Sequence, residues 1–94
     1  MSTASLDAIG LRACASLVER GVVLTATVGL RGEASEVRVT DDERTWGYGA
    51  GDLATAASCV AYRLGHLDLV DQITRERAAL QTADTIPPAA QETV

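Results

Sequence analysis

The chain has 94 residues, which corresponds to one small domain, and 47% of them are hydrophobic, as in an ordinary globular protein. Its formal net charge is −5, and all eight basic residues are arginine. A chain with this charge has no basic surface for phosphate backbones or anionic membranes, so neither nucleic-acid binding nor membrane association is expected.

The first predicted element is a helix. Apolar residues recur at helical spacing between residues 6 and 17, so one face of this helix should be buried. Ser5 is the expected N-cap, with Asp7 in the first turn, where a carboxylate interacts favourably with the helix dipole. Gly21 is the expected stop, because glycine readily adopts the left-handed conformation that ends many helices.

Three strands are predicted next. Residues 22–30 alternate in polarity with period two and are rich in β-branched side chains, which is typical of a strand. Arg31 and Gly32 are expected to form a two-residue hairpin turn into a second strand at residues 33–40. Asp41 and Asp42 are expected to form another tight turn, after which a strand at 43–48 pairs back.

The expected sheet has one apolar face. Val37 and Val39 lie on the same side of the second strand and are predicted to point inward, because alternate side chains of a strand face opposite sides. Glu36 and Arg38 then point to solvent. The simplest arrangement of the three strands is an antiparallel meander.

Two further helices are predicted after the strands. Asp52 is placed to cap or begin the first of them, and Gly65 and His66 mark its end. A third helix restarts at Leu67, and its apolar pattern weakens near Glu76. The buried stripe expected for the second helix consists of Leu53, Ala56, Ala57, Val60, Ala61 and Leu64.

The order of elements predicts an α+β fold. We expect a two-layer α-β-β-β-α(-α) arrangement in residues 1–81, with a three-stranded antiparallel meander and the helices packed on one face. Residues 82–94 are predicted to be a disordered tail, because they consist mainly of Thr, Ala, Pro, Gln and acids and contain Pro87 and Pro88.

This order of elements resembles that of double-stranded-RNA-binding domains. Such domains place basic residues at the start of the second helix, whereas Gly51, Asp52 and Leu53 stand there in this chain. The resemblance therefore implies an arrangement of elements and no RNA-binding function.

The segment from Thr45 to Asp52 carries the candidate site. It contains the only Trp, one of the two Tyr and three of the eight Gly, directly before a predicted helix. One interpretation is structural, with Trp46 and Tyr48 packed under the helices. Another is an exposed aromatic contact surface for a protein partner, formed by Trp46 and Tyr48 with Gly47 and Gly49.

The third interpretation of this segment is a small-ligand site at the corner between Gly47 and Asp52. Backbone N–H groups of a glycine-rich loop and a helix N-terminus can bind an anion. A P-loop requires lysine, which the chain lacks, and a dinucleotide fold requires a further parallel strand, which no pattern after Asp52 predicts. The acidic residues Asp41 and Asp42 upstream would also repel phosphate.

Other polar residues predict no catalytic or metal site. His66 is the only histidine, and a Cys59–His66 pair would be separated by about 10.5 Å of rise on a continuous helix. Cys14 and Cys59 lack CxxC spacing and are expected to be reduced thiols. No cofactor is predicted.

The sequence favours a small non-enzymatic protein that acts by protein–protein binding, in an adaptor or regulatory role. The residues predicted to bind this partner are Trp46, Tyr48, Gly47, Gly49, Asp41 and Asp42. The alternatives are a small-ligand-binding module at the Gly47–Asp52 corner and an acidic nucleic-acid mimic.

Composition adds an origin, a compartment and an oligomeric state to these expectations. The absence of Lys, Asn and Phe is typical of a high-GC genome, such as that of an actinobacterium or its phage. No signal peptide and no run of 18 apolar residues is found, which predicts a cytoplasmic protein. A core with so few large side chains favours a homodimer.

Overall fold

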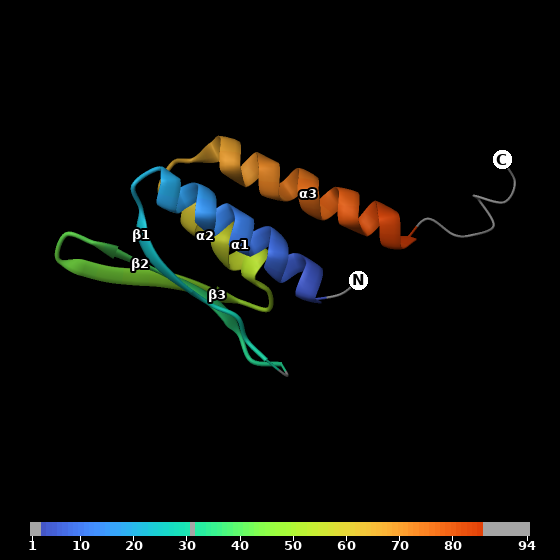
Figure 1. The fold of residues 1–94 in the computed structure, drawn as a ribbon, viewed down its shortest axis with the longest axis horizontal. Helices are drawn as coiled ribbons and strands as arrows, with labels where there is room; N and C mark the ends of the chain where they lie inside the picture. Colours follow the sequence, from blue (N-terminus) through green and yellow to red (C-terminus); the bar gives the residue numbers. More distant parts are fainter. Residues whose placement is uncertain (1–2, 31, 86–94) are drawn as a thin grey trace, which may run out of the picture.

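The computed structural model describes residues 3–30 and 32–85 and has three helices and one three-stranded sheet (Figure 1). The elements follow in the order α-β-β-β-α-α, which confirms the predicted α+β fold. Their bounds are α1 Thr3–Glu19, β1 Val23–Thr27, β2 Ser35–Asp41, β3 Arg44–Ala50, α2 Leu53–Arg63 and α3 Leu67–Thr85.

The sheet is an antiparallel meander in the order β1-β2-β3, as predicted. Its register places Leu24, Val39 and Trp46 in one row across the three strands. Val37 and Val39 are 0% and 2% exposed, which confirms that they point inward. The sheet is open, so β1 and β3 each have one edge without a neighbouring strand among the described residues.

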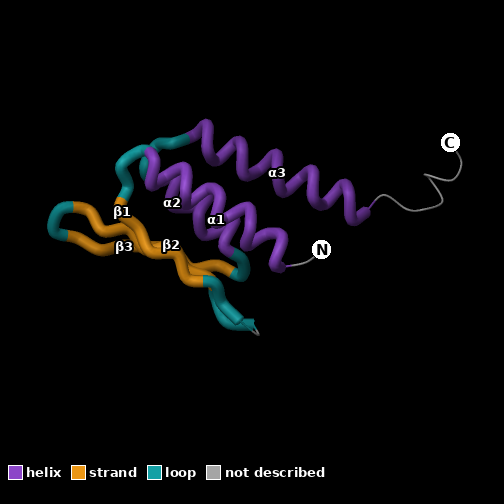
Figure 2. The backbone as a smooth tube through the Cα atoms, in the orientation of Figure 1, coloured by secondary structure: helices purple, strands orange, loops and turns teal. Residues whose placement is uncertain are grey.

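All three helices lie on the same side of the sheet (Figures 1 and 2). α1 and α2 contact the strands, whereas α3 packs mainly against α1 and α2, on their far side from the sheet. The buried core therefore has two levels, one under and one over α1 and α2. Its residues are Ile9, Ala13, Cys14, Leu17, Val37, Val39, Leu53, Ala54, Ala56, Ala57, Val60, Ala61, Leu69 and Ile73.

Glycines end the first two helices by the same hydrogen-bonding pattern. After α1, Gly21 has a φ of +91° and its N–H donates to Val18, while the N–H of Val22 donates to Leu17. After α2, Gly65 has a φ of +82°, and the N–H of His66 donates to Ala61. Both are Schellman motifs, which require a residue in the left-handed conformation, so the predicted stops are confirmed.

The predicted start of the first helix and the predicted turn between the first two strands are wrong. α1 begins at Thr3, so Ser5 lies inside the helix instead of capping it, and Asp7 lies beyond the first turn. β1 ends at Thr27 and β2 begins at Ser35, so the connection is longer than a two-residue turn. Arg31 itself lies outside the described residues.

The base of this longer connection is fixed by Ser35. Its side chain is 1% exposed, and its hydroxyl oxygen accepts a hydrogen bond from the N–H of Gly29 at 3.0 Å. This contact ties the two sides of the loop together where strand pairing has stopped.

The turn predicted at Asp41 and Asp42 is also displaced along the chain. Asp41 still pairs with Arg44 across the two strands, whereas Asp42, with a φ of +42°, belongs to the turn.

The helix α3 runs to Thr85, whereas the sequence places the end of the domain at residue 81. The prediction for residues 86–94 lies outside the described residues. No helix in the described ranges is both long enough and apolar enough to cross a membrane.

Two ion pairs reach α3, one from α1 and one from Arg20, the residue after α1. Arg20 donates to both carboxylate oxygens of Asp68, at 3.0 and 2.6 Å, and Arg12 donates to one oxygen of Glu76, at 3.3 and 2.9 Å. The hydrogen bonds from Arg20, together with its positive charge, lower the pKa of Asp68 to about 2. The pairs lie at solvent-accessible positions, where such contacts contribute little to stability.

We expect the Arg20–Asp68 ion pair to make the stability of the protein depend on pH in the acid range. The pKa of Asp68 is lower in the folded chain than its ordinary value of 3.8, so its contribution is complete above pH 4 and is lost as the pH falls towards 2. Urea unfolding of the wild type and of Asp68→Asn measures this effect. The difference between their midpoints should shrink between pH 4 and pH 2, and a difference that stays constant would contradict the assignment.

Candidate functional site

Trp46 and Tyr48 lie on the helix-facing side of β3 and are both half-buried. Their rings meet edge to face, with centroids 6.0 Å apart and an interplanar angle of 79°. The guanidinium of Arg63, in the last turn of α2, lies over the Trp46 ring at 4.2 Å from its centroid. This geometry is typical of an edge-to-face aromatic pair with a cation–π contact.

A hollow of about 320 Å³ adjoins this pair, and we call it the β3 hollow. Its lining comes from three elements, because α2 runs between the edge strand β3 and the start of α3. Tyr62 stands at it with 69% of its surface exposed. The lining residues are Tyr48, Ser58, Cys59, Tyr62 and Val70.

Only Tyr48 of this lining was predicted from the sequence. Ser58, Cys59 and Tyr62 lie on the side of α2 opposite its buried stripe, where residues usually face solvent. The sequence does place Ser58 and Tyr62 on the same helix face, because they are four residues apart. This spacing points to a hollow only when β3 is known to lie beside that face of α2.

The backbone of β3 forms an edge of the sheet next to the β3 hollow. Within residues 3–30 and 32–85, no strand pairs with the outer side of β3, so alternate backbone N–H and C=O groups there have no strand partner. Gly47 and Gly49 point to the face away from the helices, because they alternate with Trp46 and Tyr48. This edge therefore combines free hydrogen-bonding groups with an adjacent aromatic surface.

The corner between Gly47 and Asp52 has a different character. Asp52 caps α2, as predicted: its carboxylate accepts hydrogen bonds from the N–H of Thr55 at 2.8 Å and from the Thr55 hydroxyl. The N–H of Leu53 donates to Asp7 of α1 at 3.1 Å, and Asp7 is buried. Two carboxylates of the chain thus use donors that an anionic ligand would need.

The acidic residues of the predicted site lie apart from the β3 hollow. Asp41 and Asp42 are exposed at the tip of the β2–β3 hairpin, where they line a shallow polar depression with Glu43 and Arg44. The structure therefore brings Trp46 and Tyr48 together and leaves the two aspartates at the hairpin tip.

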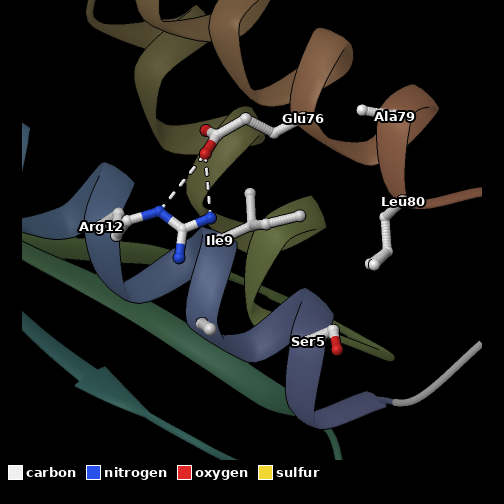
Figure 3. A pocket seen from close by; sticks show the side chains of 7 residues that line it. Ser5, Ile9, Arg12, Glu76, Ala79 and Leu80 are labelled. Carbon is white, nitrogen blue, oxygen red and sulfur yellow. Dashed lines mark hydrogen bonds and ion pairs between the residues drawn. The ribbon is translucent and has the colours of Figure 1, made fainter. Parts of the chain in front are cut away.

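A second hollow, of about 470 Å³, lies between α1 and α3 (Figure 3). The Arg12–Glu76 ion pair stands at one end, Ile9 lies near it, and Leu80 and Ser5 lie towards the other end. Its lining is mainly apolar and contains no residue of the predicted site.

Neither cysteine nor the histidine adds a catalytic arrangement. Burial raises the pKa of the Cys14 thiol to about 11, which suppresses the reactive thiolate. Cys59 is a free, exposed thiol beside Tyr62. His66 acts through its backbone, which ends α2 and accepts hydrogen bonds from Leu69 and Val70 at the start of α3.

The part of the chain that the structure describes contains no group of three or more His, Cys, Asp or Glu side chains placed to hold a metal ion. Comparison of the chain with protein-family models, curated proteins and solved structures finds no match.

Proposed function

We propose that this protein is a small, non-enzymatic adaptor or regulator that binds a partner polypeptide at the edge of β3. The observation that carries the proposal is the β3 hollow, where an exposed Tyr62 and a half-buried Tyr48 lie beside β3, an edge strand of the described sheet. Tyrosine and tryptophan supply a large share of binding energy at protein interfaces.

This arrangement favours the addition of an extended segment as a fourth strand. Such a segment would form backbone hydrogen bonds with β3, and every second side chain would face the helices. One apolar side chain would enter the β3 hollow against Tyr48 and Tyr62. Trp46 and Arg63 would flank the next position, where an aromatic or acidic side chain fits the exposed cation.

The two alternative functions, a small-ligand module and a nucleic-acid mimic, have weaker support. A small anionic ligand at the Gly47–Asp52 corner would compete with Asp7 and Asp52 for the donors of α2. Nucleic-acid mimicry requires an extended acidic surface, whereas Asp41 and Asp42 lie at one hairpin tip with Arg44 beside them.

The proposal also includes a cytoplasmic location and a homodimeric state. A second copy would add buried apolar area to a domain whose core contains small residues such as Ala54, Ala56, Ala57 and Ala61. Each protomer of such a dimer would present its own β3 hollow.

Selection from a phage-displayed library of random peptides tests the binding surface. The wild-type protein should select extended sequences with apolar residues at alternating positions, and Tyr62→Ser should weaken the binding of a selected peptide about 30-fold or more. Leu67→Ser is the matched control, because Leu67 is 60% exposed outside the hollow. Equal loss in both variants, or none in Tyr62→Ser, would contradict the proposal.

A second measurement separates strand addition from side-chain docking alone. Methylation of one backbone nitrogen of the selected peptide at a time removes a single hydrogen-bond donor without changing any side chain. Binding should fall when the methylated nitrogen faces β3, which is the case at alternate positions, and should persist at the positions between them.

A further inference from the structure

The opposite edge of the sheet, formed by β1, differs from the β3 edge in its lack of charge. Residues 21–30 contain no charged side chain and no proline, although 22% of the whole chain is charged. Val23 is 66% exposed, and even Leu24 and Ala26, on the helix-facing side, are only half-buried. Edge strands of monomeric proteins are usually protected by charges, proline or bulges, and β1 has neither charge nor proline.

An apolar stripe on α1 continues this surface. Leu11, Ala15 and Val18 are exposed and share one face of the helix, since they are spaced by four and three residues. Leu11 and Val18 have 50% and 54% of their surfaces exposed. The stripe adjoins β1 because α1 contacts β1 and the chain passes from Glu19 to Val23 through one tight turn.

We infer that the β1 edge and this α1 stripe are the surface on which a second copy of the chain docks. Two copies with a net charge of −5 repel each other, and a contact surface without charged side chains adds no like-charge repulsion to this. The β1 edge and the α1 stripe together form such a surface. The β3 edge instead carries Arg44 and lies beside Arg63.

The β1 sequence is also suited to pairing with itself. In an antiparallel pair centred on Thr25, Thr25 faces Thr25 of the second copy, Val23 faces Thr27, and Leu24 faces Ala26. Pairs of threonines and of apolar residues are favourable across antiparallel strands. The two sheets join into one six-stranded sheet, and the α1 helices of the two copies meet along Leu11 and Val18.

The proposed contact has two parts. Five paired strand residues extend about 17 Å, and the helix stripe from Leu11 to Val18 spans about 10.5 Å. The inference specifies where the proposed homodimer forms and does not depend on peptide binding at β3.

Sedimentation velocity of the full chain, from micromolar to hundreds of micromolar, tests the inference. The wild type should sediment as a dimer, and Thr25→Lys should weaken dimerisation at least tenfold. Two lysines would face each other across the junction, each beside Arg38, its neighbour on β2. Thr45→Lys adds the same charge on the opposite edge strand and should leave the dimer intact.

A mixture of two variants provides the most specific result. Thr25→Lys and Thr25→Glu, combined in equal amounts, should form a heterodimer because opposite charges then face each other. A double variant, Leu11→Glu with Val18→Glu, should also be monomeric while its circular dichroism stays that of the wild type. A monomeric wild type, or a Thr25→Lys protein that remains dimeric, would overturn the inference.

The same measurements keep the two surfaces distinct. Tyr62→Ser should lose peptide binding and remain a dimer, whereas Thr25→Lys should become a monomer and still bind the selected peptide. If the wild type is dimeric and Tyr62→Ser becomes a monomer, the second copy occupies the β3 side, and the β1 inference is wrong.

Discussion

Replacing Gly10 by alanine is expected to destabilise the protein, although glycine in a helix is ordinarily the less stable residue. A Cβ atom at Gly10 would lie 2.4 Å from the backbone carbon of Leu53 and 2.7 Å from the nitrogen of Ala54. These atoms belong to the first turn of α2 and cannot move as a flexible side chain would. The clash is expected to cost about 1–3 kcal/mol, more than the 0.5–1 kcal/mol that alanine normally gains.

The Gly10→Ala substitution should also lower stability through a second effect besides the clash. If α2 moves away from α1, the hydrogen bond from the N–H of Leu53 to buried Asp7 lengthens, and a buried carboxylate loses its partner. Thermal unfolding should show a melting temperature lower by about 5–20 °C. Gly51→Ala is the control, because a Cβ at Gly51 meets no atom within 4 Å. An increase in stability for Gly10→Ala would show that the two helices do not approach so closely.

The glycines of β3 should respond differently to the same substitution. A Cβ at Gly47 would lie 2.5 Å from the carbonyl oxygen of Val37 and 2.9 Å from the Cα of Arg38. At Gly49, the nearest atom is the carbonyl oxygen of Ser35 at 3.6 Å, an ordinary van der Waals distance. Gly47→Ala should therefore lower stability by about 1–3 kcal/mol, whereas Gly49→Ala should leave it unchanged or raise it by about 0.5–1 kcal/mol.

Urea unfolding of the two variants measures this contrast, and each serves as the other's control. The two positions share a strand and a sheet face, so a general effect of side chains on β3 would lower both midpoints equally. The result also bears on function. Gly49→Ala should retain peptide binding, because its methyl group points away from the helices and from the β3 hollow.

The sequence predicts those parts of the fold that depend on local patterns. Alternation of polarity in the second strand places Val37 and Val39 in the core, because a strand with one buried face repeats every two residues. Asp52 caps α2, and Gly65 ends it, because each meets a local requirement of the backbone. Such residues can be interpreted without knowledge of distant contacts.

The wrong predictions concern contacts between segments that are far apart in the chain. The alternating pattern of residues 22–30 has no marker of where pairing stops. Pairing ends at Thr27, two residues before the N–H of Gly29 donates to the Ser35 hydroxyl. Asp7 resembles a first-turn acid of its own helix, yet it accepts a hydrogen bond from Leu53, 46 positions away.

The candidate site was predicted only in part for the same reason. Trp46 and Tyr48 are visible in the sequence because large aromatics among glycines are unusual. Tyr62 lies on the exposed side of α2 and is indistinguishable from a solvent-facing residue until β3 is placed next to it. The location of the hollow therefore depends on how the third strand and the second helix pack.

Amide hydrogen exchange of the full chain, with and without a selected peptide, tests the central claim most directly. Addition of a strand at the β3 edge should slow exchange at alternate residues of β3, because only the N–H groups that point away from β2 can become hydrogen-bonded to the added strand. Exchange in β1 should not change. Protection confined to β1 or to the Asp41–Asp42 hairpin tip, with β3 unaffected, would contradict the proposed binding surface.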